Sequence, residues 1–126
     1  LRSPPENLLA QAQSGSGKTA AFCLAGLARV DTRLAMPQLI IVTPTRELAV
    51  QCVQETLIPM SHFMDPPLKI FSLLRGVRPP VTGIREHVVV GTPGSMLQAL
   101  RRHVLIFHHV AVFVLDEADA MLEVGG

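Results

Sequence analysis

A glycine-rich loop between a strand pattern and a helix pattern constrains this chain most. Residues 7–12 read as a buried strand, and residues 18–29 are rich in Ala and Leu, as a helix would be. Successive backbone N–H groups at the start of a helix bind phosphate, and glycines allow the phosphate to come close. The loop therefore predicts a triphosphate site whose residues are Ser14, Gly15, Ser16, Gly17, Lys18 and Thr19.

An acidic run, Asp116-Glu117-Ala118-Asp119, follows the apolar residues 110–115 near the other end of the chain. At the end of a buried strand, Asp116 can hold Mg²⁺ through water, with the Thr19 hydroxyl as a second ligand, and Glu117 can polarise an attacking water. Lys18 would bind the β- and γ-phosphates, so Lys18, Asp116 and Glu117 are the predicted catalytic residues.

Each of these two motifs has a plainer interpretation when it is taken alone. The loop could be an ordinary Ser/Gly turn with a chance Gly-Lys-Thr, and the general phosphate-loop pattern has Gly where this chain has Ala12. The acids could simply be the solvated first turn of a helix. Their order, with a strand pattern before each, favours an ATPase site that uses ATP and Mg²⁺.

Short apolar runs alternate with helical patterns along the rest of the chain. Strands are expected at 39–43, 68–73, 87–90 and 110–115, and helices at 46–57, ending before Pro59, and at 95–102. Residues 76–85 are expected to be a loop with at most a short helix. This alternation predicts an α/β fold, a mainly parallel sheet with helices on both faces and right-handed crossovers.

Composition agrees with this fold and limits its size. The chain has 126 residues, 48% hydrophobic and 17% charged, without Trp or Tyr, which suits one domain built on a sheet buried on both faces. The formal net charge is only +1, so composition by itself gives no sign of a nucleic-acid-binding surface. Any basic surface has to come from the placement of individual arginines.

Targeting and redox features point to an intracellular protein. Cys23 and Cys52 form no C-x-x-C pair and lie in apolar helical patterns, so buried reduced thiols are expected. No apolar run reaches the roughly 18 residues needed to span a membrane. The chain begins at Leu1 without Met and stops soon after the acidic run, so both ends look cut.

Four ordered motifs resemble those of the DEAD-box RNA helicases. They are Ala12-Gln13-Ser14-Gly15-Ser16-Gly17-Lys18-Thr19, Pro44-Thr45-Arg46-Glu47-Leu48-Ala49, Thr92-Pro93-Gly94 and Asp116-Glu117-Ala118-Asp119. That family's phosphate loop itself begins with Ala. The resemblance spans nearly the whole chain. It implies the first of two RecA-like lobes, with an ATP-dependent RNA helicase as the parent protein.

The resemblance also implies how RNA would be held. Two of the motifs lie where a strand ends and a helix begins, so both present N–H groups at the same edge of the sheet. In the family they hold the backbone of single-stranded RNA without reading sequence. The implied contacts are Pro44, Thr45, Arg46, Gly76, Thr92, Pro93 and Gly94, while Asp119 would couple the lobes.

Several features depart from the family pattern. In the family, Arg usually follows Thr-Pro-Gly, but here the position is Ser95, so the expected RNA-binding surface has one cation fewer. Other cations could come from Arg75, Arg78, Arg101 or Arg102. The glutamine motif, the Ser-Ala-Thr motif and the second lobe are absent, so residues 1–126 are expected to be a partial ATP-binding domain. In the resembled fold a later strand separates the phosphate-loop strand from the acidic strand, so a gap between those two is expected here.

Within the family the sequence is most similar to the mRNA-export branch, with the translation-initiation branch as the alternative. The cues include Glu6-Asn7-Leu8-Leu9, a lone Gly76 after Arg75, and Val112-Phe113-Val114-Leu115. This branch implies cytoplasm, nucleus or the nuclear pore as the location, a regulatory protein activator, and a monomer. Two other functions stay open: a truncated or silent helicase that only binds nucleotide or RNA, and an unrelated P-loop ATPase.

Overall fold

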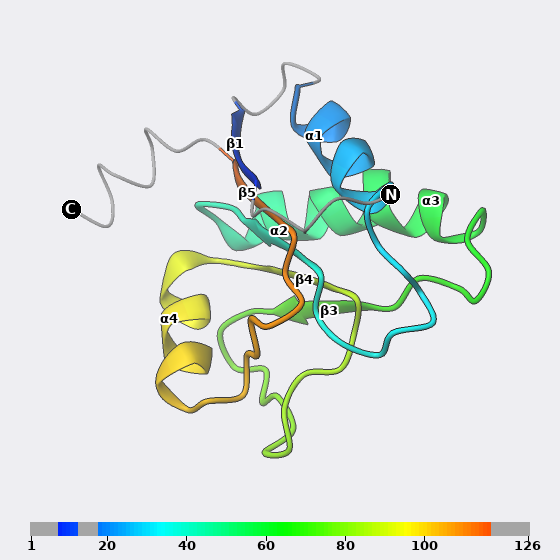
Figure 1. Ribbon diagram of the computed structural model, residues 1–126. Helices are drawn as coiled ribbons and strands as arrows, with labels where there is room; N and C mark the ends of the chain where they lie inside the picture. Colours follow the sequence, from blue (N-terminus) through cyan, green and yellow to red (C-terminus); the bar gives the residue numbers. More distant parts are fainter. Residues whose placement is uncertain (1–7, 13–17, 117–126) are drawn as a thin grey trace.

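The computed structural model describes residues 8–12 and 18–116, which form one five-stranded parallel sheet (Figure 1). The strand order across the sheet is β1-β5-β2-β4-β3. The α/β class and the parallel sheet predicted from the sequence are therefore confirmed. In chain order the elements are β1 (Leu8–Ala12), α1 (Lys18–Leu27), β2 (Leu39–Val42), α2 (Arg46–Cys52), η1 (Val53–Leu57), α3 (Ile58–Ser61), β3 (Ile70–Leu73), β4 (Val88–Gly91), α4 (Pro93–Arg101) and β5 (Val112–Asp116).

The centre of the sheet is β2, which pairs with β5 on one side and β4 on the other. Leu39 lies opposite both Val112 and Val88, and the pairing continues residue by residue to Val42. All four residues of β2 are buried. A parallel sheet covered on both faces needs such uninterrupted apolar strands, which explains why no polar alternation is visible in the sequence of β2.

Helices cover both faces of the sheet, as the sequence predicted. On one face, α1, α2 and η1 pack on alternate strand residues such as Ile41, Val90 and Val114. On the other face, α4 packs on the intervening residues, among them Ile40 and Val89. In Figure 1, α4 accordingly lies on the opposite side of the strands from α1. The period of two along each strand thus divides the core into two layers.

The expected gap between the phosphate-loop strand and the acidic strand is absent, so that prediction was wrong. The two strands β1 and β5 pair directly in parallel, from Leu8 opposite Val112 to Ala12 opposite Asp116. A gap would leave the facing N–H and C=O groups of both strands without partners, and direct pairing satisfies them. Ala12 and Asp116, the first residues of the two predicted nucleotide motifs, are therefore brought side by side.

The helical segment that begins at Arg46 is longer than predicted and changes its winding. It continues from α2 through the π-helical η1 into α3, so it passes Pro59 and ends at Ser61 instead of near Leu57. Pro has no N–H to donate and its ring crowds the preceding turn of an α-helix. The wider turn of η1, in which Ile58 N–H donates to Val53 C=O, lies directly before Pro59.

The other boundaries shift by small amounts. The helix predicted at 95–102 begins earlier, at Pro93, because Pro is well suited to the first turn of a helix. The strand predicted at 68–73 is shorter and begins at Ile70. Residues 76–85 contain no helix or strand, as predicted. Among the residues that the structure describes, no helix is both long and apolar enough to cross a membrane.

Close packing at one glycine holds the far side of the sheet together. A Cβ added at Gly91, the last residue of β4, would clash with the carbonyl oxygen of Leu73 in β3. That contact involves backbone, which cannot move aside as a flexible side chain could. Only glycine therefore lets the ends of β3 and β4 approach this closely.

Candidate functional site at the carboxyl edge of the sheet

The predicted nucleotide motifs begin at one part of the carboxyl edge of the sheet. Ala12 ends β1 and lies opposite Asp116, which ends β5 and is 3% exposed. The helix α1 begins at Lys18, soon after β1 in the sequence, and Thr19 is its second residue. Burial of an acid at this position keeps a carboxylate beside the start of the predicted phosphate loop.

Several residues of the predicted nucleotide site lie outside the described part of the chain. For Lys18 and Thr19 the structure gives the course of the backbone in α1. The phosphate- and metal-binding roles of Lys18 and Thr19 stay predictions, as do the roles of the residues outside the described part. Outside the described residues are Ser14, Gly15, Ser16, Gly17, Glu117 and Asp119.

Next along the edge, Thr45 caps α2 directly after β2. Its hydroxyl oxygen accepts a hydrogen bond from Leu48 N–H at 3.2 Å, so the capping role expected from the sequence is confirmed. The first N–H groups of a helix have no partner within the helix. The exposed residues Thr45 and Arg46 therefore stand where backbone donors point out of the sheet edge.

The helix α4 starts in a similar way after β4, but its first residue is a proline. Thr92 is the N-cap residue, Pro93 follows, and Gly94 is exposed. No atom within 4 Å would meet a Cβ added at Gly94, so the space beside this glycine is open. The Thr92 hydroxyl lies 3.2 Å from the Ser95 hydroxyl and makes no capping bond to a backbone N–H.

The ends of β2 and β4 are joined at this edge by short hydrogen bonds. Thr43 N–H donates to Gly91 C=O at 2.9 Å, and the buried Thr43 hydroxyl donates to Thr45 C=O at 3.0 Å. These bonds fix the backbone just before both helix starts. The structure thus brings together two predicted RNA-binding motifs that are more than 40 residues apart in the sequence.

The remaining predicted RNA contact, Gly76, lies in a third segment, which follows β3 on the outer side of β4. Leu73 pairs with Gly91, so the segment that leaves β3 runs beside Thr92. Gly76 has a φ of +89°, a conformation that glycine adopts without strain, and it too faces open space. All seven residues predicted to contact RNA therefore lie along the ends of β2, β4 and β3.

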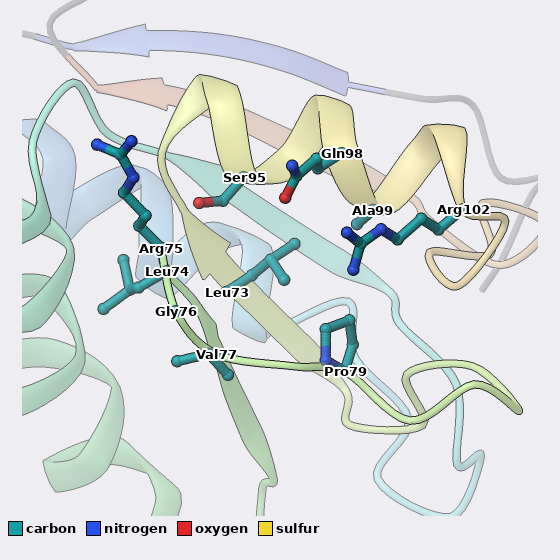
Figure 2. Close-up of a pocket in the computed structure, with 10 residues that line it drawn as sticks. All are labelled: Leu73, Leu74, Arg75, Gly76, Val77, Pro79, Ser95, Gln98, Ala99 and Arg102. Carbon is teal, nitrogen blue, oxygen red and sulfur yellow. The ribbon is translucent and has the colours of Figure 1, made fainter.

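A groove runs between α4 and the segment that leaves β3. Its wider part has a volume of about 390 Å³ and is lined by Arg75, Thr92, Gly94, Ser95 and Gln98. Figure 2 shows the narrower part, where Ser95, Gln98 and Arg102 lie on the side of α4 that faces this segment. The lining of the narrower part consists of Leu73, Leu74, Arg75, Gly76, Val77, Pro79, Ser95, Ala99, Gln98 and Arg102.

The groove adds Gln98 to the residues that the sequence singled out. Gln98 lies three positions after Ser95, a spacing that places both on one face of a helix. The helix expected at 95–102 already contains both residues, so the sequence carried this signal, and what it lacked was the packing of α4 beside the segment that leaves β3. Arg75 and Arg102, two of the arginines that could replace the missing cation, also line the groove. Arg78 and Arg101 are exposed but do not line it.

The acids and histidines of the described residues do not form a dedicated metal cage. No group of three His, Cys, Asp or Glu side chains gathers anywhere in residues 8–12 and 18–116. Mg²⁺ in nucleotide sites is commonly bound by one or two protein oxygens together with phosphate oxygens and water. A single buried carboxylate, Asp116, therefore fits Mg²⁺ carried by a nucleotide better than a metal bound by the protein alone.

Comparison with protein families gives a match over nearly the entire chain. The model of the DEAD/DEAH box helicase family matches residues 2–126. Among curated proteins, the ATP-dependent RNA helicase DBP5 of Candida albicans is 43% identical over 126 residues, which is 100% of this chain and 23% of the relative. DDX25 of Xenopus laevis is 43% identical over 128 residues, 100% of this chain and 26% of the relative. The chain thus spans about a quarter of the length of these relatives.

Solved structures agree with the sequence relatives. S. cerevisiae Dbp5 bound to RNA and ADP BeF3 superposes with a TM-score of 0.80 at 41% identity, covering 98% of this chain and 31% of that one. A Dbp5 variant bound to Nup159, a Gle1 variant, IP6 and ADP gives the same TM-score and identity, covering 98% and 32%. The predicted RecA-like fold is confirmed by these similarities, and the chain belongs to the DEAD/DEAH box helicase family.

Proposed function

We propose that this chain is the nucleotide-binding lobe of an ATP-dependent RNA helicase, which couples ATP binding and hydrolysis to the remodelling of RNA duplexes or ribonucleoproteins. One observation carries the proposal. The strand ends that bear the nucleotide motifs, β1 and β5, adjoin those that bear the RNA motifs, β2, β4 and β3, along one edge of a single sheet. Ligands of open α/β sheets bind at this edge.

The nucleotide part of the proposal assigns ATP with Mg²⁺ to the edge formed by β1 and β5. Backbone N–H groups at the start of α1 and Lys18 would bind the phosphates, while Asp116 and Thr19 would hold the metal through oxygen atoms. Bound Mg²⁺ neutralises charge on the phosphates and positions them for attack by water. Glu117 would orient that water. The ADP-bound relatives support a nucleotide here.

The RNA part of the proposal assigns a single strand to the edge formed by β2, β4 and β3. Helix starts at Thr45 and Thr92 present N–H groups suited to successive phosphates, and Arg46 adds a cation. Open space at Gly94 and Gly76 would let a backbone approach. Such contacts are independent of sequence, and the RNA-bound Dbp5 structure supports this choice of ligand.

The similarity to DBP5 further supports a role in mRNA export. On this proposal the parent protein acts at the nuclear pore, in the cytoplasm or in the nucleus, and a protein activator regulates it, as the complexes of Dbp5 with Gle1 and Nup159 suggest by analogy. Residues 1–126 would then be part of the first RecA-like lobe of a monomer, with Asp119 contributing to coupling between lobes.

The nucleotide assignment can be tested with the two lysines of the chain. Binding of a fluorescent ATP analogue with Mg²⁺ to the 126-residue chain is expected to weaken by at least tenfold in Lys18→Ala, because one charge-assisted contact to phosphate is lost. The matched control is Lys69→Ala, which removes the same charge before β3 at the opposite edge of the sheet. Equal affinities in the two variants would contradict the assignment.

The RNA assignment has its own matched arginines. Cross-linking to a single-stranded RNA oligomer is expected to fall severalfold in Arg46→Ala at low salt, and to stay unchanged in Arg85→Ala, which lies before β4 at the opposite edge. The chain by itself is expected to bind nucleotide weakly and not to unwind RNA. Phosphate release by the chain that RNA stimulates and Lys18→Ala abolishes would show this last expectation to be wrong.

A further inference from the structure

Two buried thiols that are distant in sequence meet beneath the sheet. Cys23 in α1 and Cys52 in α2 are 29 residues apart, and their Sγ atoms lie 3.9 Å from each other. Cys23 is 0% exposed and Cys52 is 8% exposed, and both belong to the core on the α1 side of the sheet. The sequence predicted two buried reduced thiols but not their contact. Neither takes part in the proposed nucleotide or RNA chemistry.

The contact makes the two thiols chemically unequal. The hydrogen bond between them lowers the pKa of Cys52, against the effect of burial, because the Cys23 thiol stabilises the Cys52 thiolate. The same hydrogen bond, together with burial, raises the pKa of Cys23. The negative charge of Asp116 raises the pKa of both. Cys52 is thus the thiol that ionises first and lies nearer to solvent, and Cys23 is a protonated thiol beside it.

We propose that Cys23 and Cys52 form a site of reversible covalent modification, an intramolecular disulfide made by hydrogen peroxide. The Cys52 thiolate attacks one peroxide oxygen, the O–O bond breaks, and Cys52 becomes a sulfenic acid while the other oxygen leaves and takes up a proton. The Cys23 sulfur then attacks the sulfenic sulfur, the S–S bond forms, and water leaves with the Cys23 proton. Two thiols are oxidised and one peroxide is reduced to two waters.

The two helices allow this bond with a small movement. A disulfide has its sulfur atoms about 2.05 Å apart, so the two sulfurs have to approach by roughly 2 Å. We expect side-chain rotation and a slight shift of α1 toward α2 to bring the sulfurs together, since they already lie 3.9 Å apart within one layer of the core. No third cysteine competes, because the chain has only these two.

The disulfide would join the two halves of the carboxyl edge. Cys23 follows Lys18 by a little over one turn of α1, and Cys52 ends α2, which Thr45 caps. Linking α1 to α2 therefore ties the helix after the predicted phosphate loop to the helix that opens the predicted RNA surface. Closing a loop of this length restricts the unfolded chain, so we expect the Tm to rise by about 5 to 10 °C.

The test treats the folded 126-residue chain with hydrogen peroxide near stoichiometric amounts and measures its intact mass and its peptide map without reductant. The expected products are a monomer that has lost two hydrogens and a peptide cross-linked between Cys23 and Cys52, both reversed by dithiothreitol. The cross-link is expected to form faster in the folded chain than in urea, where no contact holds the thiols together.

Single variants separate the roles of the two thiols. Cys23→Ala is expected to leave a sulfenic acid on Cys52 that dimedone captures, whereas Cys52→Ala is expected to leave Cys23 unmodified. The wild-type cross-link is measured without any substitution, so a variant that fails to fold does not remove the test. Unmodified thiols, a sulfinic acid on Cys52 without a cross-link, dimers joined between chains, or equal rates in urea would each overturn the proposal.

Discussion

The two halves of the carboxyl edge, where we propose that ATP and RNA bind, offer different kinds of binding group. In the half formed by β1 and β5, the described feature is one side chain, the buried carboxylate of Asp116 beside Ala12. In the half formed by β2, β4 and β3, the features are mainly backbone: two helix starts, of which α2 is capped by Thr45, a glycine beside open space and a glycine with positive φ. The first arrangement suits a compact, metal-bound phosphate, and the second suits an extended chain of phosphates.

This difference predicts how each half responds to mutation. A site that depends on one buried carboxylate is lost when that side chain changes, even if the fold is kept. A site that depends on backbone donors is lost when the backbone shifts, and it tolerates many side-chain changes. Substitutions can therefore be chosen that damage one half and leave the other intact.

The largest effect is expected where the backbone of the RNA half is most closely packed. Gly91→Ala is expected to lower the free energy of unfolding by about 3 kcal/mol, because its Cβ would meet the Leu73 carbonyl and push β4 away from β3. Urea unfolding followed by circular dichroism measures this change.

Gly94→Ala is the matched control for crowding at a glycine. Its Cβ meets open space in a helix, so stability is expected to be unchanged or to rise by up to about 1 kcal/mol. RNA cross-linking is nevertheless expected to weaken, since the methyl group enters the space left for the RNA backbone. A large loss of stability in this variant would show that Gly94 is structural.

The next effect tests whether the nucleotide half can be disabled alone. Asp116→Asn keeps the shape of the side chain and removes its charge, so Mg²⁺-dependent affinity for an ATP analogue is expected to fall roughly 10- to 100-fold. RNA cross-linking without nucleotide is expected to stay the same.

Asp31→Asn serves as the control for loss of an acidic charge. Asp31 is exposed and pairs with Arg33 at 3.1 Å in the segment after α1, away from the carboxyl edge. Titration calorimetry should find its nucleotide affinity equal to that of the wild type. If Asp116→Asn also keeps its affinity, Asp116 does not hold the metal.

A smaller effect is expected at the cap of α2. Thr45→Ala removes the hydroxyl that accepts the Leu48 N–H, and the free energy of unfolding should fall by about 1 kcal/mol. Thr45→Ser keeps the acceptor and should recover most of this loss in the same urea titration. Equal losses in both variants would mean that the threonine methyl group, and not the cap, carries the stability.

The smallest expected effect lies at the opposite edge of the sheet, away from both halves. Burial lowers the pKa of His87, with help from nearby Lys69 and against Thr32 C=O, Asp31 and Glu86. Its Nδ1 accepts the Lys69 N–H at 2.9 Å, a bond that protonation would remove. The unfolded chain therefore binds the proton more readily, and stability should fall as pH drops below about 6.5, the ordinary histidine value.

This pH dependence can be isolated by substitution. Urea midpoints measured between about pH 7.5 and pH 5 are expected to fall for the wild type and to fall less for His87→Gln. Asp31 also has a lowered pKa, caused by its hydrogen bonds with Arg33, but its contribution is lost only at more acidic pH, below its ordinary value of 3.8. Parallel curves for wild type and His87→Gln would contradict the assignment to His87.

The sequence was a good guide to local structure because each element carries its own signal. β2 and β4 are short apolar runs, Thr45 and Pro93 mark helix starts, and Gly76 marks a turn with positive φ. Pro59 was a misleading signal. A proline normally ends a helix, but here a π-helical turn precedes it. Val53 and Leu57 of that turn are buried in the core, a tertiary contact that the local sequence does not reveal.

Long-range contacts were harder to predict than local structure. Direct pairing of β1 with β5 was not foreseen, since strand order depends on which backbone groups find partners, and a pattern along the chain does not contain that information. Gln98 was not singled out because the groove that it lines forms between α4 and the segment that leaves β3, which come from different parts of the chain. The contact of Cys23 with Cys52 required the relative placement of two helices.

The sequence by itself determined the family, the parallel α/β fold and the residues of both predicted sites, because phosphate loops, caps and strand ends are written in short stretches of chain. Tertiary structure decided which of these stretches adjoin. It set Asp116 beside Ala12, joined the ends of β2 and β4 through Thr43, and brought two thiols together. Those arrangements arise from packing and backbone pairing between distant segments, which no local pattern encodes.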